Sequence, residues 1–195
     1  MRFAGRRGLI TLLLCGVLAF SFSACQTVPE TTGTEGFFNL EDFVSKQIEK
    51  LAQIRPEVEK RLILNGEEDV IVTKDVNWED EFSYFLESDI SKPSLRDSYF
   101  VERTDDHTEI YHLKEGQHHP VKEFKAVYDP ESGQIRQLFV NIEKETQLFD
   151  ISRELKLVLN GNKDDNRILS YEIKGVQQLV LSDDKIFEIK GEIRY

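Results

Sequence analysis

The second half of this 195-residue chain alternates apolar and polar residues from Ser98 to its last residue. A period of two predicts β-strands that have one buried and one exposed face. Turn signals rich in Gly, Pro, Asn and Asp separate most of the alternating runs, so neighbouring strands are expected to pair antiparallel through hairpins. We therefore expect a meander of six or seven strands, with runs at 111–113, 124–128, 138–142, 155–159, 169–173 and 187–195.

The segment before the strands has a helical period instead. Apolar residues recur there every three or four positions, which predicts an amphipathic helix that begins near Asn39: Leu40, Val44, Ile48, Leu51, Ile54, Val58 and Leu62. Asn39 is a favourable N-cap, and Phe38 and Phe43 stand where a hydrophobic staple would form. Pro56 either kinks this helix or starts a second one, and Asn65-Gly66 supplies its end.

A shorter helix is expected near residues 77–90, capped by Asp75 or Asn77. A helix with one apolar stripe and a sheet with one apolar face each need a partner. The expected fold class is therefore α+β, with N-terminal amphipathic helices packed in a curved antiparallel sheet, as a single globular domain over residues 37–195. This outline resembles the half-barrel of periplasmic lipoprotein carriers, in architecture and not in motif.

One five-residue pattern occurs twice within the predicted sheet. Residues 171–175, Tyr-Glu-Ile-Lys-Gly, are echoed by residues 187–191, Phe-Glu-Ile-Lys-Gly. A turn at residues 182–184 would place the two copies on neighbouring strands, where their charges pair diagonally across the exposed face. We interpret this pattern as a solvated hairpin face, in which the glycines let the sheet bend, and not as a binding ladder.

The N-terminus has the layout of an export signal. Arg2, Arg6 and Arg7 precede an apolar run from Leu9 to Phe22, and Ser23-Ala24-Cys25 follows. A cysteine after two small residues resembles the lipobox of bacterial lipoproteins. The resemblance implies that residues 1–24 are removed, that Cys25 carries a diacylglycerol, and that residues 25–36 form the lipidated Cys and a flexible tether.

Two other interpretations of this segment fit it less well. An uncleaved membrane anchor needs about 18 or more apolar residues, and this run is shorter and interrupted by Gly16 and Ser21. An ordinary secretory signal would leave Cys25 as a free thiol without a disulfide partner, because Cys15 leaves with the signal.

The charge of the chain argues against two classes of partner. Its formal net charge is −11, and removal of the three signal arginines makes the mature protein more acidic. An acidic surface disfavours binding to nucleic acid and electrostatic docking on anionic headgroups. The membrane partner expected from the sequence is therefore the lipid anchor itself, with an envelope protein as a further candidate partner.

No motif for nucleophilic, metallopeptidase or nucleotide chemistry occurs, so we expect no enzyme and no cofactor. All four histidines lie between residues 107 and 119. With a two-residue turn at Glu115-Gly116, His112 would face His119, which makes these two a weak candidate pair of metal ligands. Two ligands without a third favour ordinary surface histidines, so no metal site is expected.

The sequence thus predicts a lipid-anchored envelope protein with a non-catalytic binding or scaffold domain. The alternative is a carrier-like lipoprotein that binds lipid or another hydrophobic ligand on the concave side of the sheet. The two classes differ in whether the helices fill that side, and the apolar helical positions favour filling.

A third alternative is a small outer-membrane β-barrel, suggested by the alternating last strand that ends at Tyr195. For the favoured class, Gln26 after the cysteine resembles outer-membrane lipoproteins, and the lack of an acidic cluster at residues 26–29 favours the periplasmic face.

Overall fold

The computed structural model describes residues 37–105 and 107–195, which belong to one compact unit, Gly33–Tyr195. The predicted signal at 1–24, Cys25 and nearly all of the tether lie outside the described residues.

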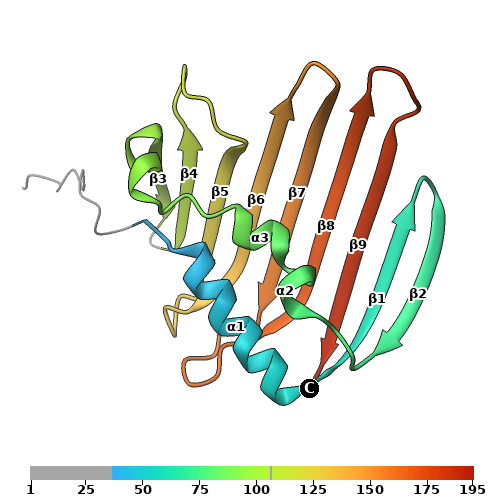
Figure 1. Ribbon diagram of the computed structural model, residues 1–195. Coiled ribbons are helices and arrows are strands. Elements are labelled where there is room, and N and C mark those ends of the chain that lie inside the picture. Colours follow the sequence, from blue (N-terminus) through green and yellow to red (C-terminus); the bar gives the residue numbers. More distant parts are fainter. Residues whose placement is uncertain (1–36, 106) are drawn as a thin grey trace, which may run out of the picture. The chain divides into compact units, whose positions relative to one another are not determined.

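Nine antiparallel strands form one open sheet, in the order β2-β1-β9-β8-β7-β6-β5-β4-β3 (Figure 1). The strands are β1 (Glu57–Leu64), β2 (Glu67–Thr73), β3 (Tyr99–Asp105), β4 (Thr108–Leu113), β5 (Val121–Tyr128), β6 (Ile135–Glu145), β7 (Phe149–Leu159), β8 (Ile168–Leu179) and β9 (Lys185–Arg194). The seven strands after Ser98 form the predicted meander. The edge strands β2 and β3 do not pair with each other.

The strand count was too low because the predicted first helix was too long. Helix α1 covers Leu40–Ile54 and ends at Arg55, whose φ of 50° is left-handed, directly before Pro56. The chain then enters the β1–β2 hairpin. Asn65-Gly66 is its two-residue turn and not a helix end, since both residues have positive φ, as such tight hairpins require.

The start of α1 is as predicted. The Asn39 side chain accepts a hydrogen bond from the backbone N–H of Asp42 at 2.8 Å. The rings of Phe38 and Phe43 pack with their centroids 5.4 Å apart, which completes the hydrophobic staple. Together these contacts give a backbone N–H of the first turn its hydrogen-bond acceptor and fix the direction in which the chain enters the helix.

The second predicted helix is divided into α2 (Trp78–Glu81) and α3 (Ser83–Glu87), which meet at Phe82. Asn77 caps α2, as one of the two predicted alternatives. A 3-10 helix, η1 (Pro93–Ser98), leads into β3. No helix among the described residues is long and apolar enough to cross a membrane.

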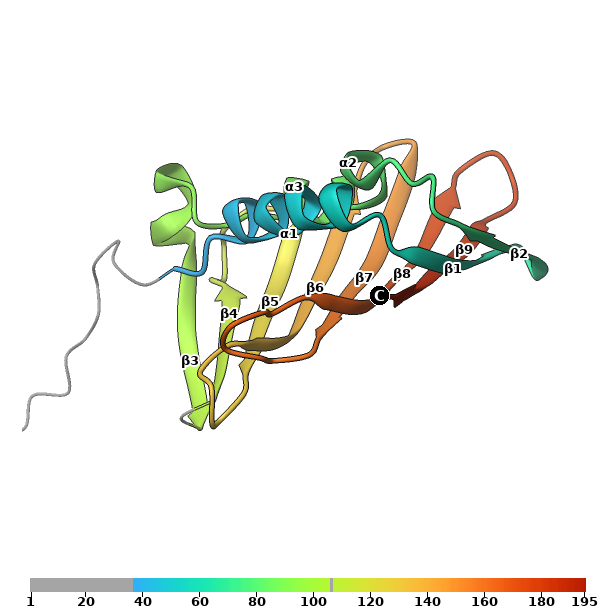
Figure 2. The same ribbon diagram turned by 90° about the horizontal axis from the view of Figure 1, so that it is seen from below.

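All three α-helices lie on one face of the sheet, which curves beneath them (Figure 2). The core forms between the helices and this face, and its fully buried large side chains come from both: Leu40, Leu51, Phe82, Phe85, Ile90, Tyr111, Phe124, Leu138, Leu155, Leu157, Leu159 and Tyr171. We call this side the helix-bearing face and the opposite side the outer face.

Candidate functional site

The helices cover only part of the helix-bearing face. In Figure 1 they lie across the middle strands. Strands β1 and β2 stand clear of them, and so do β7, β8 and β9 near the β6–β7 and β8–β9 turns. The cross-strand register tells which side chains face this uncovered area. Leu62 pairs with Ile189 and Leu64 with Phe187, four and six residues along from the buried core pair of Val58 and Ile193.

Six apolar residues share this uncovered area, and we call them the open patch: Leu62, Leu64, Ile71, Ile151, Phe187 and Ile189. Leu62, Leu64 and Ile71 are 44%, 49% and 54% exposed, while the other three are half-buried. A cluster of exposed large apolar side chains on one face is typical of a binding surface.

A cation whose Nε is buried lies on the same face, beside the open patch. Arg153 of β7 pairs in register with Gly175 of β8, which pairs in turn with Phe187 of β9. The guanidinium carbon lies 4.4 Å from the centroid of the Tyr84 ring of α3. Arg153 therefore stands between the helices and the open patch.

This arginine has no carboxylate partner among the described residues, although the chain is rich in acids. None of the ion pairs there includes Arg153. Its Nε is buried without a hydrogen-bond acceptor. A partly buried cation without a counter-charge loses solvation that nothing in the described chain replaces, which is unfavourable unless a ligand provides an anion.

Gly175 makes room for this arrangement. A Cβ at Gly175 would lie 2.5 Å from the ring of Phe187 and 3.2 Å from Cγ of Arg153. The aromatic ring and the arginine stem therefore lie close to the bare backbone of β8 from either side. The sequence had suggested this glycine as a point where the sheet bends, and the structure adds that it seats two side chains.

The outer face behind the open patch carries paired charges and not apolar side chains. Glu172 lies directly opposite Lys190, and Lys174 directly opposite Glu188, so the predicted charge pairs face each other and are not diagonal. Lys190 approaches Glu172 at 3.1 Å, and its pKa is raised by hydrogen bonds to Glu188 and Glu172. The four charges satisfy one another, which supports the interpretation of a solvated hairpin face.

The predicted facing of the two histidines is wrong. The β4–β5 connection spans residues 114–120 and is not a two-residue turn, so His112 pairs with Glu123. His112 lies between Glu102 and Glu123, at 3.2 and 3.4 Å, and stacks on the Phe100 ring.

His119 has different neighbours. Its Nδ1 lies 2.7 Å from the hydroxyl of Tyr99, and burial lowers its pKa. The structure therefore does not bring this pair together, and the described residues contain no group of three or more His, Cys, Asp or Glu side chains arranged to hold a metal ion.

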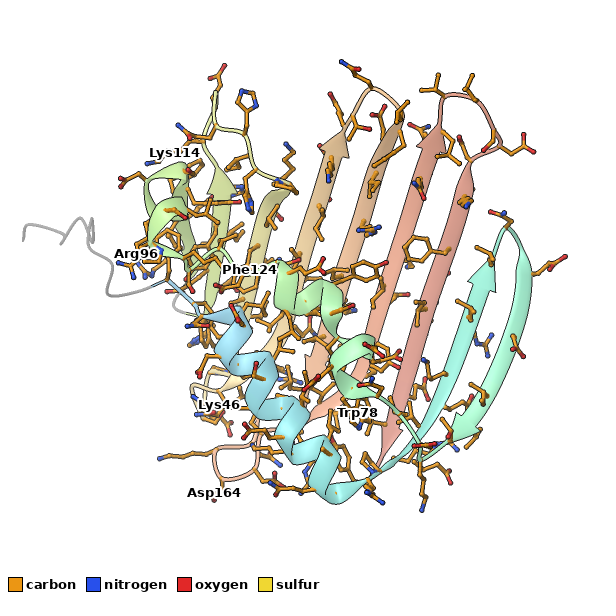
Figure 3. The ribbon with its side chains drawn as sticks, viewed as in Figure 1. Lys46, Trp78, Arg96, Lys114, Phe124 and Asp164 are labelled. Carbon is orange, nitrogen blue, oxygen red and sulfur yellow. The ribbon has the colours of Figure 1, made fainter. Side chains whose placement is uncertain are left out.

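Hollows of the described surface lie elsewhere. One, of about 660 Å³, lies beside the end of α1 and is lined by both basic and acidic side chains, including Arg55, Lys74, Asp75 and Glu79. Another, of about 340 Å³, lies along α1 and is lined mainly by polar residues, among them Asn166. In Figure 3, Trp78 lies at the start of α2 and Phe124 on β5 beside the helices, and both are away from the uncovered strand ends.

The sequence contained a signal for Arg153 that the strand prediction did not use. Arg153 has the same parity as Leu155, Leu157 and Leu159, so alternation alone places it on the buried face of β7. The open patch had no comparable signal, because Leu62 had been assigned to a helix.

Searches against protein-family models, curated proteins and solved structures found no match to this chain.

Proposed function

We propose that this protein is a lipid-anchored envelope protein whose domain binds a hydrophobic ligand, without catalysis, on the open patch. The observation that carries the proposal is the exposure of Leu62, Leu64 and Ile71 on a face whose other half is packed under helices. Burial of apolar surface gives about 25 cal/mol per Å², so a ligand that covers this cluster gains binding free energy from it.

The incomplete filling of the concave side by the helices supports the carrier-like alternative. We expected the helices to fill the concave side, which would have left only a scaffold role. Helix α1 ends at Ile54, and its predicted continuation forms β1 instead, so an apolar residue that would have plugged the sheet, Leu62, lines an uncovered part of it.

The proposed location depends on the sequence alone. The lipobox-like segment at Ser23-Ala24-Cys25 supports a diacylglycerol on Cys25, and Gln26 supports the outer membrane, with the domain on the periplasmic face. Residues 26–36 are long enough to let the domain approach or leave the bilayer surface, which suits a protein that collects an apolar ligand there.

A protein partner is the second candidate, favoured by a different observation. Strand β2 is an edge of the sheet, and its central Val70, Ile71 and Val72 are all about half exposed. An unpaired edge with apolar side chains on both faces can accept a strand from another chain. This is the form that the binding or scaffold role would take.

Photo-crosslinking of the full-length chain in isolated membranes tests the proposal. A long-chain alcohol with a diazirine in its tail is expected to label the open patch, with modified peptides mapping to β1 and β9. Leu62→Asp should abolish that labelling, whereas Arg61→Asp, on the outer face of the same strand, should not. Labelling confined to other surfaces would contradict the proposal.

A further inference from the structure

The position of Arg153 bears on the chemical class of the ligand. Along one cross-strand row, the side chains read Arg153 on β7, Gly175 on β8, Phe187 on β9 and Leu64 on β1. Neighbouring strands lie about 4.8 Å apart, so this row extends roughly 14 Å from the cation to the far apolar side chain. A ligand with a polar head at one end and a single apolar chain along the row would match this arrangement.

The charge at that end is fixed and uncompensated. A guanidinium stays protonated at any physiological pH and prefers planar anions that accept two hydrogen bonds, carboxylate above all. Within the described residues its guanidinium lies over the Tyr84 ring, which attracts a cation but carries no negative charge to neutralise it. The Nη groups of Arg153 are thus the cation that an incoming carboxylate would meet.

Two other cations of this face differ from Arg153. Acids outnumber bases in the chain by 36 to 25; Lys60 is already paired with Glu81, and Lys185 is exposed at the start of β9. Lys60 is therefore not available to a ligand in the way that Arg153 is. A general attraction for anions does not exist on such an acidic domain, so selectivity for an anionic head requires a specific local cation.

We propose that the open patch binds a single-chain anionic amphiphile, a fatty carboxylate, with its head on Arg153 and its chain along Phe187, Ile189 and Leu62. This inference rests on the proposed function and adds the charge of the head and the number of chains.

Two matched photoprobes test it on the full-length chain in isolated membranes: a fatty acid and the fatty alcohol of the same length, each with the diazirine at the same tail carbon. Labelling of the open patch is normalised to total membrane labelling. We expect the acid to label it about tenfold more than the alcohol, the ratio for one charge-assisted hydrogen-bonded contact.

Arg153→Gln should lower labelling by the acid to about the level of labelling by the alcohol, and a urea unfolding transition close to that of wild type would show that the variant is folded. Arg153→Lys should retain part of the preference for the acid. The matched control is Arg167→Gln, because Arg167 also lies over an aromatic ring, at 4.6 Å from Tyr195, but is already paired with Asp165.

The outcomes separate the two proposals. Equal labelling by acid and alcohol, unaffected by Arg153→Gln, overturns this inference and leaves the hydrophobic site standing. Labelling of the open patch by neither probe overturns the proposed function and this inference with it.

Discussion

Tyr171 of β8 lies over Gly191 of β9, its register partner, so closely that a Cβ at Gly191 would be 2.0 Å from the tyrosine ring. The hydroxyl of Tyr171 reaches across to α2 and donates a hydrogen bond to Glu81 at 2.6 Å. The Phe82 ring meets the tyrosine ring edge-on, with centroids 5.2 Å apart. One glycine on the last strand thus seats the ring that joins the sheet to the helices.

Gly191→Ala should destabilise the domain. The added methyl would meet the Tyr171 ring, and overpacking of this kind costs about 1–3 kcal/mol. The opposing gain, from a less flexible unfolded chain, is only about 0.4–1 kcal/mol. Urea unfolding should therefore give a lower free energy of unfolding, while Glu192→Ala, an exposed neighbour, should stay within about 0.5 kcal/mol of wild type. Equal stability of the two variants would show that the ring can move aside.

Asp89→Ala should weaken the attachment of α1. The buried carboxylate of Asp89 accepts hydrogen bonds from the backbone N–H of Leu40 at 3.0 Å and from Ser91 Oγ at 2.8 Å. Removal of the carboxylate leaves a buried N–H at the start of the helix unsatisfied, at a cost of about 1–3 kcal/mol. Asp89→Asn retains an acceptor oxygen and should cost less in the same unfolding measurement. If both variants lose the same free energy, the hydrogen bond to Leu40 is not what holds the helix start.

His119 should make the domain less stable in acid. Burial lowers its pKa below the ordinary value of 6.5, with smaller contributions that lower it from Lys122 and Lys92 and one that raises it from the hydrogen bond of Val121. Below about pH 6.5 the unfolded chain binds a proton that the folded chain does not, so the free energy of unfolding falls as the pH falls. His119→Gln should flatten this fall between about pH 7 and 5.5 in urea titrations. An unchanged pH profile would assign the acid sensitivity to other groups.

Cys25→Ala should release the full-length protein from the membrane. The expected diacylglycerol is attached to this thiol, and without it the acidic chain has little affinity for anionic headgroups. Fractionation after a salt wash should find the variant in the soluble fraction and Cys15→Ala still in the membrane fraction. Retention of Cys25→Ala, or an intact mass without acyl groups for the natural protein, would refute lipid anchoring.

The strands after Ser98 were predictable because alternation and turn residues agree there over many residues. The region 56–73 was not, because Val58 and Leu62 fit both a helical stripe that continues from Ile54 and a strand face. Pro56 was the local signal that decides between the two, since it disfavours a helical Arg55. The structure resolves the ambiguity through pairing with β9, which lies more than a hundred residues away and which no local pattern reveals.

The candidate site was less predictable than the fold for the same reason. The alternation along β7 places Arg153 on the helix-bearing face. Its lack of a carboxylate partner, however, depends on which strands and helices meet there. The histidine pair failed because one loop length was wrong, and a shift of register changes every cross-strand neighbour.

The pairing of β1 with β9 ties an early hairpin to the last strand of the chain. A polypeptide that emerges N-terminus first, from a ribosome or a translocation channel, holds β1 and β2 long before their partner exists. Assembly of the sheet must wait until β9 is free, since long-range pairing is the slow step in such topologies. The order of synthesis thus delays completion of the sheet until more than a hundred residues after β1 have been made.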